Sequence, residues 1–409
     1  PRDATTSDIY FAKGHIAPAS ERRVFIVDTS VIFSAMQNLK RHIPSKGVEI
    51  QRDHTVMSAL HKLSCDYILF CKECCLHCVQ PAPLEATQLD AEHYRKLYSC
   101  WDLFSVLYTP EQNDIPMGDD LMEWLNTHYV EPTSEEGDHL SNLDRPWEDE
   151  AFWPYLTRAI MRGLAKASTF FLEVLSKHSS RHLANFAQQL KTLVEEHPRL
   201  NQFSAERDFS VKSWKWRDQI KALQLELATV PDEERQDEFE NWWDRFSGIV
   251  GVLAGHVDMS IKVCREVGAD WREMCALWCI YVNPTLRRLD FTRIATTILD
   301  EMPADPTNSE DLIHSALFLC DGKEAISEAL RMDVWLAVHL ADMLEPLDII
   351  DKEQDDAGLT LRDHCVLAYV DYMRSDPTLW RHIVDYLYTC GGIGEGMADE
   401  MLMRVPLRL

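Results

Sequence analysis

The stretch DVWLAVHLADML, residues 333–344, sets the fold class of this chain. Apolar residues recur in it at intervals of two to four, which builds a broad apolar stripe along a helix. These residues are Val334, Leu336, Ala337, Leu340, Ala341 and Leu344. The spacing therefore predicts a helix that packs against other helices.

Helical periodicity continues on both sides of this stretch, from about residue 31 to the end of the chain. Further helices are expected over 31–41, 53–78, 86–108, 118–129, 148–161, 164–177, 181–196, 209–229, 232–253, 257–267, 270–282, 287–302, 309–319, 323–331, 361–374, 378–390 and 395–403. Helices joined by short loops pack as antiparallel neighbours, but no fixed repeat period is present. We therefore predict a mainly α protein, built as an irregular α-helical stack that is either a solenoid or a folded-back variant of one.

Three stretches are predicted to be loops. The acidic segment 131–149 contains Pro, Gly and Ser, and 351–359 is rich in carboxylates. A calcium-binding EF-hand loop needs Gly at its sixth position, where this chain has Asp356, so a solvated loop is the preferred interpretation. GGIGEG, residues 391–396, follows a helix rather than a strand, which favours a helix end and loop over a dinucleotide site.

Composition excludes several classes of function. The 409 residues include 41 basic and 67 acidic side chains, a formal net charge of −26 that disfavours binding to nucleic acid or to anionic membrane surfaces. No apolar run reaches the length of a membrane span, and no signal peptide is visible at the N-terminus. The 12 cysteines lack regular spacing and are expected to be reduced thiols. These features predict a soluble protein of the cytosol or nucleus.

The segment CKECCLHC, residues 71–78, suggests a metal site at first sight. Its four cysteines instead extend an apolar helical stripe, and one straight helix cannot wrap four sulfurs around one ion. The stripe consists of Leu60, Leu63, Tyr67, Ile68, Cys71, Cys74, Cys75 and Cys78. A packing role is therefore preferred, with a metal site and a redox role as the alternatives.

No catalytic motif accompanies the 16 scattered histidines: neither a zinc-binding H-E-x-x-H nor a nucleophile elbow is present. The tryptophan pairs are interpreted as core and helix-contact residues rather than ligand platforms. These pairs are Trp214 with Trp216 and Trp242 with Trp243. We predict that the chain is not an enzyme and uses no cofactor or metal.

The segment 8–33, DIYFAKGHIAPASERRVFIVDTSVIF, departs from the helical pattern. Short runs of β-branched and aromatic residues, separated by turn residues, predict strands over 8–13, 15–18 and 22–28. An isolated ribbon of two or three strands is marginally stable, and nothing later in the chain offers strands to pair with it.

Both faces of this predicted ribbon are apolar. The residues concerned are Ile9, Tyr10, Phe11, Ala12, Val24, Phe25, Ile26 and Val27. Two apolar faces imply burial between two other sheets, which a partner protein would supply. Strand addition to a partner, filling the place of a blade in an incomplete β-propeller, is the leading hypothesis. A hairpin folded against helices of the same chain is the alternative.

An ordered set of segments runs through the chain. In order these are DIYFAKGHIA, RRVFIVDTSVIFSAM, LYSCWDLFSVLY, LMEWLNTHYVE, FWPYLTRAIMRG, SWKWRDQI, MDVWLAVHLADML, DPTLWRHIVDYLYTC and RVPL. Together they resemble the Nup85 family of nucleoporins, which are subunits of the Y-shaped scaffold complex of the nuclear pore. The resemblance implies a structural scaffold at the nuclear envelope that supports nucleocytoplasmic transport of mRNA and protein.

The resemblance also implies an organisation in two parts. Residues 1–30 would be an insertion blade that completes, in trans, the open propeller of the partner Seh1. Residues 31–409 would form the helical coat element, called crown and trunk, that is shared with vesicle-coat scaffolds. The implied blade contacts are Ile9, Tyr10, Phe11, Ile16, Val24, Phe25, Ile26 and Val27. Family members continue into a helical tail that joins other subunits of the Y complex, so this chain resembles a fragment without that tail.

Two other functions remain open at this point. A vesicle-coat subunit would be built on the same helical element, and a metalloenzyme would use the cysteines of 71–78. None of these functions is expected to involve binding of nucleic acid or direct insertion into a membrane.

Overall fold

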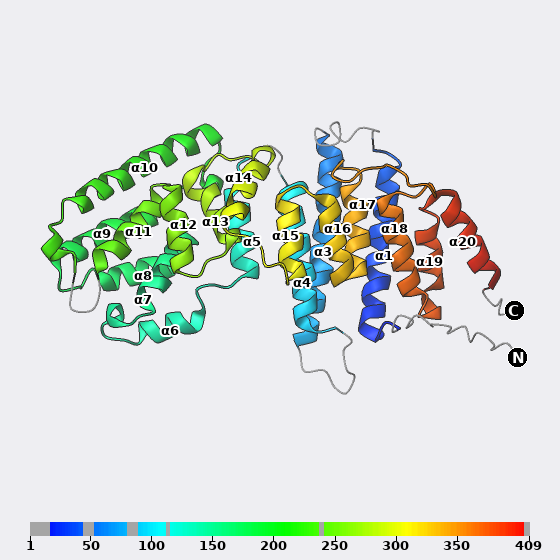
Figure 1. Cartoon of the computed structure of the whole chain (residues 1–409), viewed down its shortest axis with the longest axis horizontal. Helices are drawn as coiled ribbons and strands as arrows, with labels where there is room; N and C mark the ends of the chain where they lie inside the picture. Colours follow the sequence, from blue (N-terminus) through cyan, green and yellow to red (C-terminus); the bar gives the residue numbers. More distant parts are fainter. Residues whose placement is uncertain (1–16, 44–52, 80–88, 112–114, 237–240, 405–409) are drawn as a thin grey trace, which may run out of the picture. The chain divides into compact units, whose positions relative to one another are not determined.

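The computed structural model describes residues 17–43, 53–79, 89–111, 115–236 and 241–404. Over these residues the chain is almost entirely helical and contains no strand, which confirms the mainly α prediction. It forms two compact units (Figure 1). Unit 1 combines Pro1–Glu111 with Pro306–Leu409, and unit 2 is the intervening segment Gln112–Asp305.

Unit 1 brings the start and the end of the chain together. Its helices are α1 (Ser20–Lys40), α3 (His54–Val79), α4 (Ala91–Tyr108), α15 (Ser309–Phe318), α16 (Gly322–Met332), α17 (Val334–Leu344), α18 (Leu361–Met373), a 3₁₀ turn (Pro377–Leu379), α19 (Trp380–Leu387) and α20 (Gly391–Arg404). Successive helices from α15 to α20 pack in order, and α4 packs against α15. Helix α1 packs against α3, α17 and α19, so the chain folds back onto its own beginning (Figure 1).

Unit 2 is a second helical stack that also closes on itself. Its elements are α5 (Gly118–His128), α6 (Ser134–Ser141), α7 (Phe152–Met161), α8 (Ala165–Leu175), α9 (Arg181–Glu195), α10 (Glu206–Ala228), α11 (Trp242–Leu253), α12 (Val257–Glu266), α13 (Trp271–Leu277), a π-helical turn (Trp278–Val282) and α14 (Arg288–Glu301), with 3₁₀ turns at Pro146–Glu148, Leu200–Gln202 and Asp232–Glu234. Its first helix, α5, packs against α13 near the end of the unit, and the amide of Met117 donates to the carbonyl of Leu286 at 3.2 Å.

Helix α17 is the most completely buried helix segment of unit 1, and its sequence explains why. Every residue from Trp335 to Leu344 is buried, because an apolar helix without a polar face must be covered on all sides. Asp333 starts the helix: its carboxylate accepts the amide of Trp335 at 2.8 Å.

The strand predicted over 22–28 is wrong, because these residues belong to α1. The apolar run Val24–Val27 is compatible with a strand over these four residues only. Along the whole segment, buried side chains recur at helical spacing, at Phe25, Thr29, Phe33 and Met36. Packing of that stripe overrides the strand propensity of the β-branched residues. The predicted strand 8–13 and the start of the predicted strand 15–18 lie outside the described residues.

Two of the three predicted loops also need correction. Within 131–149, α6 is stabilised by a capping box between Thr133 and Glu136, which lets a very polar sequence form a helix. Helix α20 begins at Gly391, so 391–396 are helical rather than a loop. Gly391 itself has φ +58°, a backbone conformation that glycine adopts readily. The loop 351–359 is confirmed: it is exposed up to Gly358.

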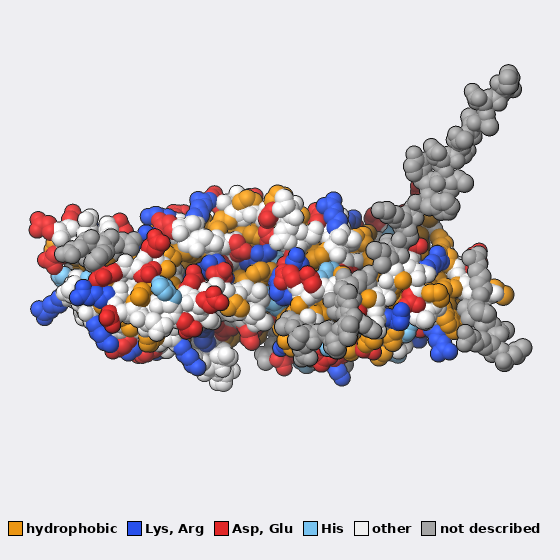
Figure 2. All heavy atoms as spheres, turned by 90° about the horizontal axis from the view of Figure 1, so that it is seen from below, with side chains coloured by type: hydrophobic (Ala, Val, Ile, Leu, Met, Phe, Trp, Pro, Cys, Tyr) orange, Lys and Arg blue, Asp and Glu red, His pale blue; other side chains and the backbone are white. Residues whose placement is uncertain are grey.

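The surface is mixed in charge. On the face drawn in Figure 2, acidic and basic side chains are interspersed, with apolar side chains scattered between them. Among the described residues no helix is long and apolar enough to cross a bilayer.

Candidate functional site

The cysteine cluster on α3 is only partly in the core. Cys71 is buried, while Cys74, Cys75 and Cys78 are half-buried. Burial raises the pKa of each of the four thiols, that of Cys74 to about 12, so they remain protonated at neutral pH. Metal ligation and nucleophilic attack both need the thiolate. In the part of the chain that the structure describes, no three His, Cys, Asp or Glu side chains converge as a metal site.

A buried polar site of unit 1 holds the N-terminal end of α1. The guanidinium of Arg22 donates to both carboxylate oxygens of Asp333, at 2.7 and 2.8 Å, and His93 Nε2 lies 2.7 Å from the same carboxylate. Both partners of the Arg22–Asp333 ion pair are buried. Burial opposes ionisation of Asp333, but Arg22 and the hydrogen bond from His93 outweigh it and lower its pKa to about 2. One carboxylate thus joins α1, α4 and α17.

A second carboxylate of α17 holds the other end of α1. Asp342 accepts hydrogen bonds from Lys40 Nζ at 2.8 Å and Gln37 Nε2 at 2.7 Å, both on α1, and from Arg362 Nε on α18 at 3.0 Å. Burial again opposes ionisation, yet Lys40 and Arg362 lower the pKa of Asp342 to about 2. Helix α1 is therefore fixed to α17 at both ends by charge-assisted hydrogen bonds.

Between these two anchors, α1 contributes aromatic residues to the core. Phe25 packs against Trp335 with ring centroids 4.5 Å apart, and Phe33 stacks on Tyr386 at 3.8 Å. Trp335 Nε1 donates to Thr29 Oγ1 at 2.9 Å, so its polar atom is also satisfied by α1. The contacts connect residues about 300 positions apart in sequence.

The structure divides the residues predicted to contact a propeller into three groups. Phe25 and Ile26 are 1% and 0% exposed, so their prediction as partner contacts is wrong: helices of the same chain cover them. Val24 is 57% exposed and Val27 is half-buried. The remaining four lie outside the described residues, and these are Ile9, Tyr10, Phe11 and Ile16.

The anchors of α1 were missed from the sequence, although a signal was present. Asp333 precedes an apolar run in the position of a helix cap, and Asp342 interrupts that run. A carboxylate in the middle of a fully apolar helix needs a buried cationic partner. The sequence pattern does not reveal which of the 41 basic residues supplies it.

His339 provides a test of this core by pH. Its Nδ1 lies 2.7 Å from the Trp335 carbonyl and its Nε2 2.7 Å from the Tyr386 hydroxyl. Burial lowers its pKa from 6.5 to about 4. The unfolded chain therefore takes up this proton first as the pH falls, and stability is lost between pH 6.5 and 4, by up to about 3 kcal/mol. Asp333 and Asp342 add a further loss between their ordinary pKa of 3.8 and about 2.

We expect urea unfolding of the protein at pH 7, 5.5 and 4.5 to show this decline. In the variant His339→Gln the decline between pH 6.5 and 4 should be smaller, because one titrating group is removed. Equal pH dependence of the variant and the original protein would contradict the assignment to His339.

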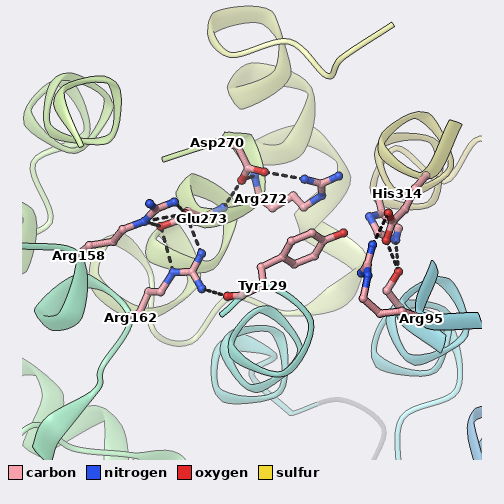
Figure 3. A network of polar contacts seen from close by, with 10 residues as sticks. Arg95, Tyr129, Arg158, Arg162, Asp270, Arg272, Glu273 and His314 are labelled. Carbon is pink, nitrogen blue, oxygen red and sulfur yellow. Dashed lines mark hydrogen bonds and ion pairs between the residues drawn. The ribbon is translucent and has the colours of Figure 1, made fainter. Parts of the chain in front are cut away.

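Unit 2 has its own buried charge cluster, drawn in Figure 3. Glu273 of α13 accepts from Arg158 of α7 and from Arg162, which directly follows α7, with an Arg162 Nη2–Glu273 Oε1 distance of 2.7 Å. Arg162 also donates to the Tyr129 carbonyl, and Arg158 pairs with Glu131 at 3.0 Å. Burial opposes ionisation of Glu273, but hydrogen bonds from both arginines lower its pKa. The cluster fixes α7, α13 and the turn after α5 to one another.

A further polar cluster, also drawn in Figure 3, joins α4 to α15 in unit 1. Arg95 donates to Glu310 at 2.8 Å, and Ser99 Oγ donates to the same carboxylate at 2.5 Å. His314 Nε2 lies 3.4 Å from Ser99 Oγ. The carboxylate of Glu310 thus accepts hydrogen bonds from a neighbouring helix. Asp333, Asp342 and Glu273 likewise accept hydrogen bonds from residues on, or directly next to, other helices. Such groups hold helices in register.

Two small cavities in unit 2 meet at His197 and Trp216. One of about 140 Å³ is lined by His197, Trp216 and Tyr281, below the size usual for cofactor and metabolite sites. Burial lowers the pKa of His197 to about 3, so it is neutral at physiological pH.

The comparisons with known proteins agree with this architecture. A family model described as Nup85 Nucleoporin matches residues 14–409. Nuclear pore complex protein Nup85 of Xenopus tropicalis is 23% identical over 315 residues, which covers 75% of this chain and 46% of the relative. The human protein of the same name is 22% identical over 317 residues, with the same coverage. Nucleoporin nup85 of Schizosaccharomyces pombe is 25% identical over 321 residues, 76% of this chain and 46% of the relative.

The chain spans about half the length of the curated relatives it matches. The family match, by contrast, extends over nearly all of the chain and includes both helical units. The chain belongs to the Nup85 nucleoporin family.

Proposed function

We propose that this chain is a non-enzymatic scaffold element of the nuclear pore complex, located at the nuclear envelope. The observation that carries the proposal is the double anchoring of α1 by Asp333 and Asp342, which makes the two ends of the chain into one closed unit. Unit 1 would correspond to the trunk and unit 2 to the crown of the folded-back coat element. The buried charged side chains of both units form ion pairs and hydrogen bonds within their own unit, as expected of a rigid support.

The mechanical consequence is specific. In an open helical stack, terminal helices can separate one at a time, because each contacts only its neighbours. Here α1 cannot leave α17 without exposing Asp333 and Asp342 and uncovering Trp335. Removing one partner of a buried ion pair leaves the other charge uncompensated, which costs several kcal/mol. A stack closed in this way keeps its curvature when partners pull on it.

We further propose that the segment before α1 binds the Seh1 propeller. Ile9, Tyr10, Phe11 and Ile16 fit a strand with two apolar faces. Because α1 begins at Ser20, the blade residues would end before it, and Phe25 and Ile26 are no longer part of the proposal. The exposed side chain of Val24 would extend the contact onto the first turns of α1.

The experiment is co-expression with the Seh1 propeller, followed by size exclusion with light scattering. The full chain is expected to form a one-to-one complex, and a chain lacking residues 1–16 is expected to lose it. The double variant Ile9→Asp with Phe11→Asp should behave like the deletion, because both residues share one strand face. Circular dichroism should show the same helical signal for all forms. If the complex survives the deletion, the contact with Seh1 lies on the helical units instead.

Two alternatives remain for comparison. A vesicle-coat subunit would use the same helical element, but the family match favours the pore. A metalloenzyme based on the cysteines of α3 is disfavoured by their raised pKa values.

A further inference from the structure

Helix α10 buries an apolar face and exposes three large apolar side chains on the opposite face. Its inner face is buried against α9 and α11, and the residues concerned are Phe209, Trp216, Ile220, Leu223 and Leu227. Its outer face exposes Val211 by 49%, Trp214 by 73% and Leu225 by 73%. Figure 1 shows α10 as a long helix at the edge of unit 2. A helix packed on one side normally presents polar residues on the other, so this second apolar face calls for an explanation.

The outer residues follow a heptad. Starting at Val211, steps of three and four lead to Trp214, Asp218, Lys221 and Leu225. This seam lies opposite the buried residues on the helix, because positions a and d of a heptad are opposite position f, which Trp216 and Leu223 occupy. The seam has the spacing by which one helix packs along another.

The seam carries two lysines, although the whole chain has a net charge of −26. Lys215, at position e, borders the exposed Trp214, and Lys221 occupies a d position within the seam. Both lysines are exposed, and neither forms an ion pair within the described parts of the chain. Between Val211 and Leu225 the only acidic residue is Asp218. Charges beside a helix seam select the partner by complementarity.

We propose that the outer face of α10 is a docking surface for an amphipathic helix of a partner protein, with acidic residues along the edges of its apolar stripe. Trp214 would be the central anchor, since a large aromatic side chain gains most from being covered. Asp218, inside the seam, would pair with one basic residue of the partner helix and fix its register. This surface is separate from the N-terminal segment proposed to bind Seh1.

The same charges argue against two other occupants. An anionic membrane would be repelled by a chain of charge −26, and it would have to bury Asp218 in the middle of the apolar face. A second copy of α10, packed face to face, would place lysines against lysines. An acidic helix satisfies Lys215 and Lys221 and covers Trp214 at the same time.

The test uses two synthetic helical peptides of about four heptads, identical in their Leu seam. One carries Glu along both edges of the seam and the other carries Lys. Fluorescence anisotropy with the full chain is expected to show binding of the Glu peptide, and at least about tenfold weaker binding of the Lys peptide. Trp214→Ala should weaken binding of the Glu peptide at least about tenfold. The double variant Lys215→Glu with Lys221→Glu should reverse the preference between the peptides.

The matched control is Leu289→Ala, which removes an apolar side chain that is 85% exposed on α14 of the same unit. It should bind the Glu peptide as the original chain does. Equal binding of the two peptides, or unchanged binding by Trp214→Ala, would overturn the proposal. So would binding to phosphatidylserine vesicles that Trp214→Ala abolishes, which would indicate a membrane. Dimerisation in light scattering that Trp214→Ala abolishes would indicate a second copy instead.

Discussion

Replacing Ile26 by Asp is expected to unfold unit 1. The side chain of Ile26 is 0% exposed, in the stripe of α1 that packs against the rest of the unit. A carboxylate placed there would lie in the apolar stripe of α1, away from water, and burying it is one of the most costly single substitutions. We expect a loss of more than about 4 kcal/mol, visible as a collapse of the urea midpoint. Phe25→Asp should act in the same way, because Phe25 packs against Trp335.

The same charge two residues earlier serves as the control. Val24 is 57% exposed on the same helix, so Val24→Asp should change stability by less than about 1 kcal/mol. An acidic residue near the start of a helix is also favourable to the helix dipole. If Ile26→Asp and Val24→Asp were equally stable, α1 would not be part of the core.

Hydrogen exchange can locate the damage. Helices α3, α17 and α19 contact α1 and should lose protection first in Ile26→Asp. Protection that remains in α17 would mean that Asp333 and Trp335 keep their surroundings without α1. The experiment also separates stability from partner binding, because Val24→Asp leaves the core intact while altering the accessible side of α1.

The segment 22–28 shows why the fold could be predicted only in part. Four successive apolar residues, Val24–Val27, fit a strand as well as a helix. The decision is made by where Phe25, Ile26, Phe33 and Met36 find partners, and α1 packs against α3 and also against α17 and α19 near the end of the chain. Most individual helices of unit 1 are local and were predicted, except for the first half of α1 and the start of α20. The pairing of α1 with α17 is a long-range contact that no local pattern contains.

Charged and aromatic residues show the same limit. The position of Asp342 in an apolar helix indicated a buried carboxylate, but not that Lys40 and Arg362 would meet it. Trp214 and Trp216 were predicted to be core and helix-contact residues; Trp216 is buried, while Trp214 is 73% exposed. Two residues apart on a helix they face nearly opposite directions, so one core prediction for both could not hold.

Replacing Glu273 by Leu is expected to be the most destabilising polar substitution in unit 2. Arg162 is 2% exposed and Arg158 is largely covered, and both use Glu273 as their carboxylate. Without it, two guanidinium groups remain in the interior, one of them with only the Tyr129 carbonyl and the other with Glu131. Breaking a buried pair from one side costs about 3–5 kcal/mol. Thermal and urea unfolding should both show the loss.

Two companion variants decide whether the loss comes from the stranded charges. Glu301→Leu breaks the exposed pair with Arg265 in the same unit and should cost less than about 1 kcal/mol. The triple variant that combines Glu273→Leu with Arg158→Met and Arg162→Met removes the stranded charges along with their partner. It should therefore recover most of the stability, because a well-packed apolar cluster of similar volume replaces a buried ion pair at little cost. A triple variant as unstable as Glu273→Leu alone would mean that the cluster is needed for its hydrogen bonds, such as that from Arg162 to the Tyr129 carbonyl, rather than for charge balance.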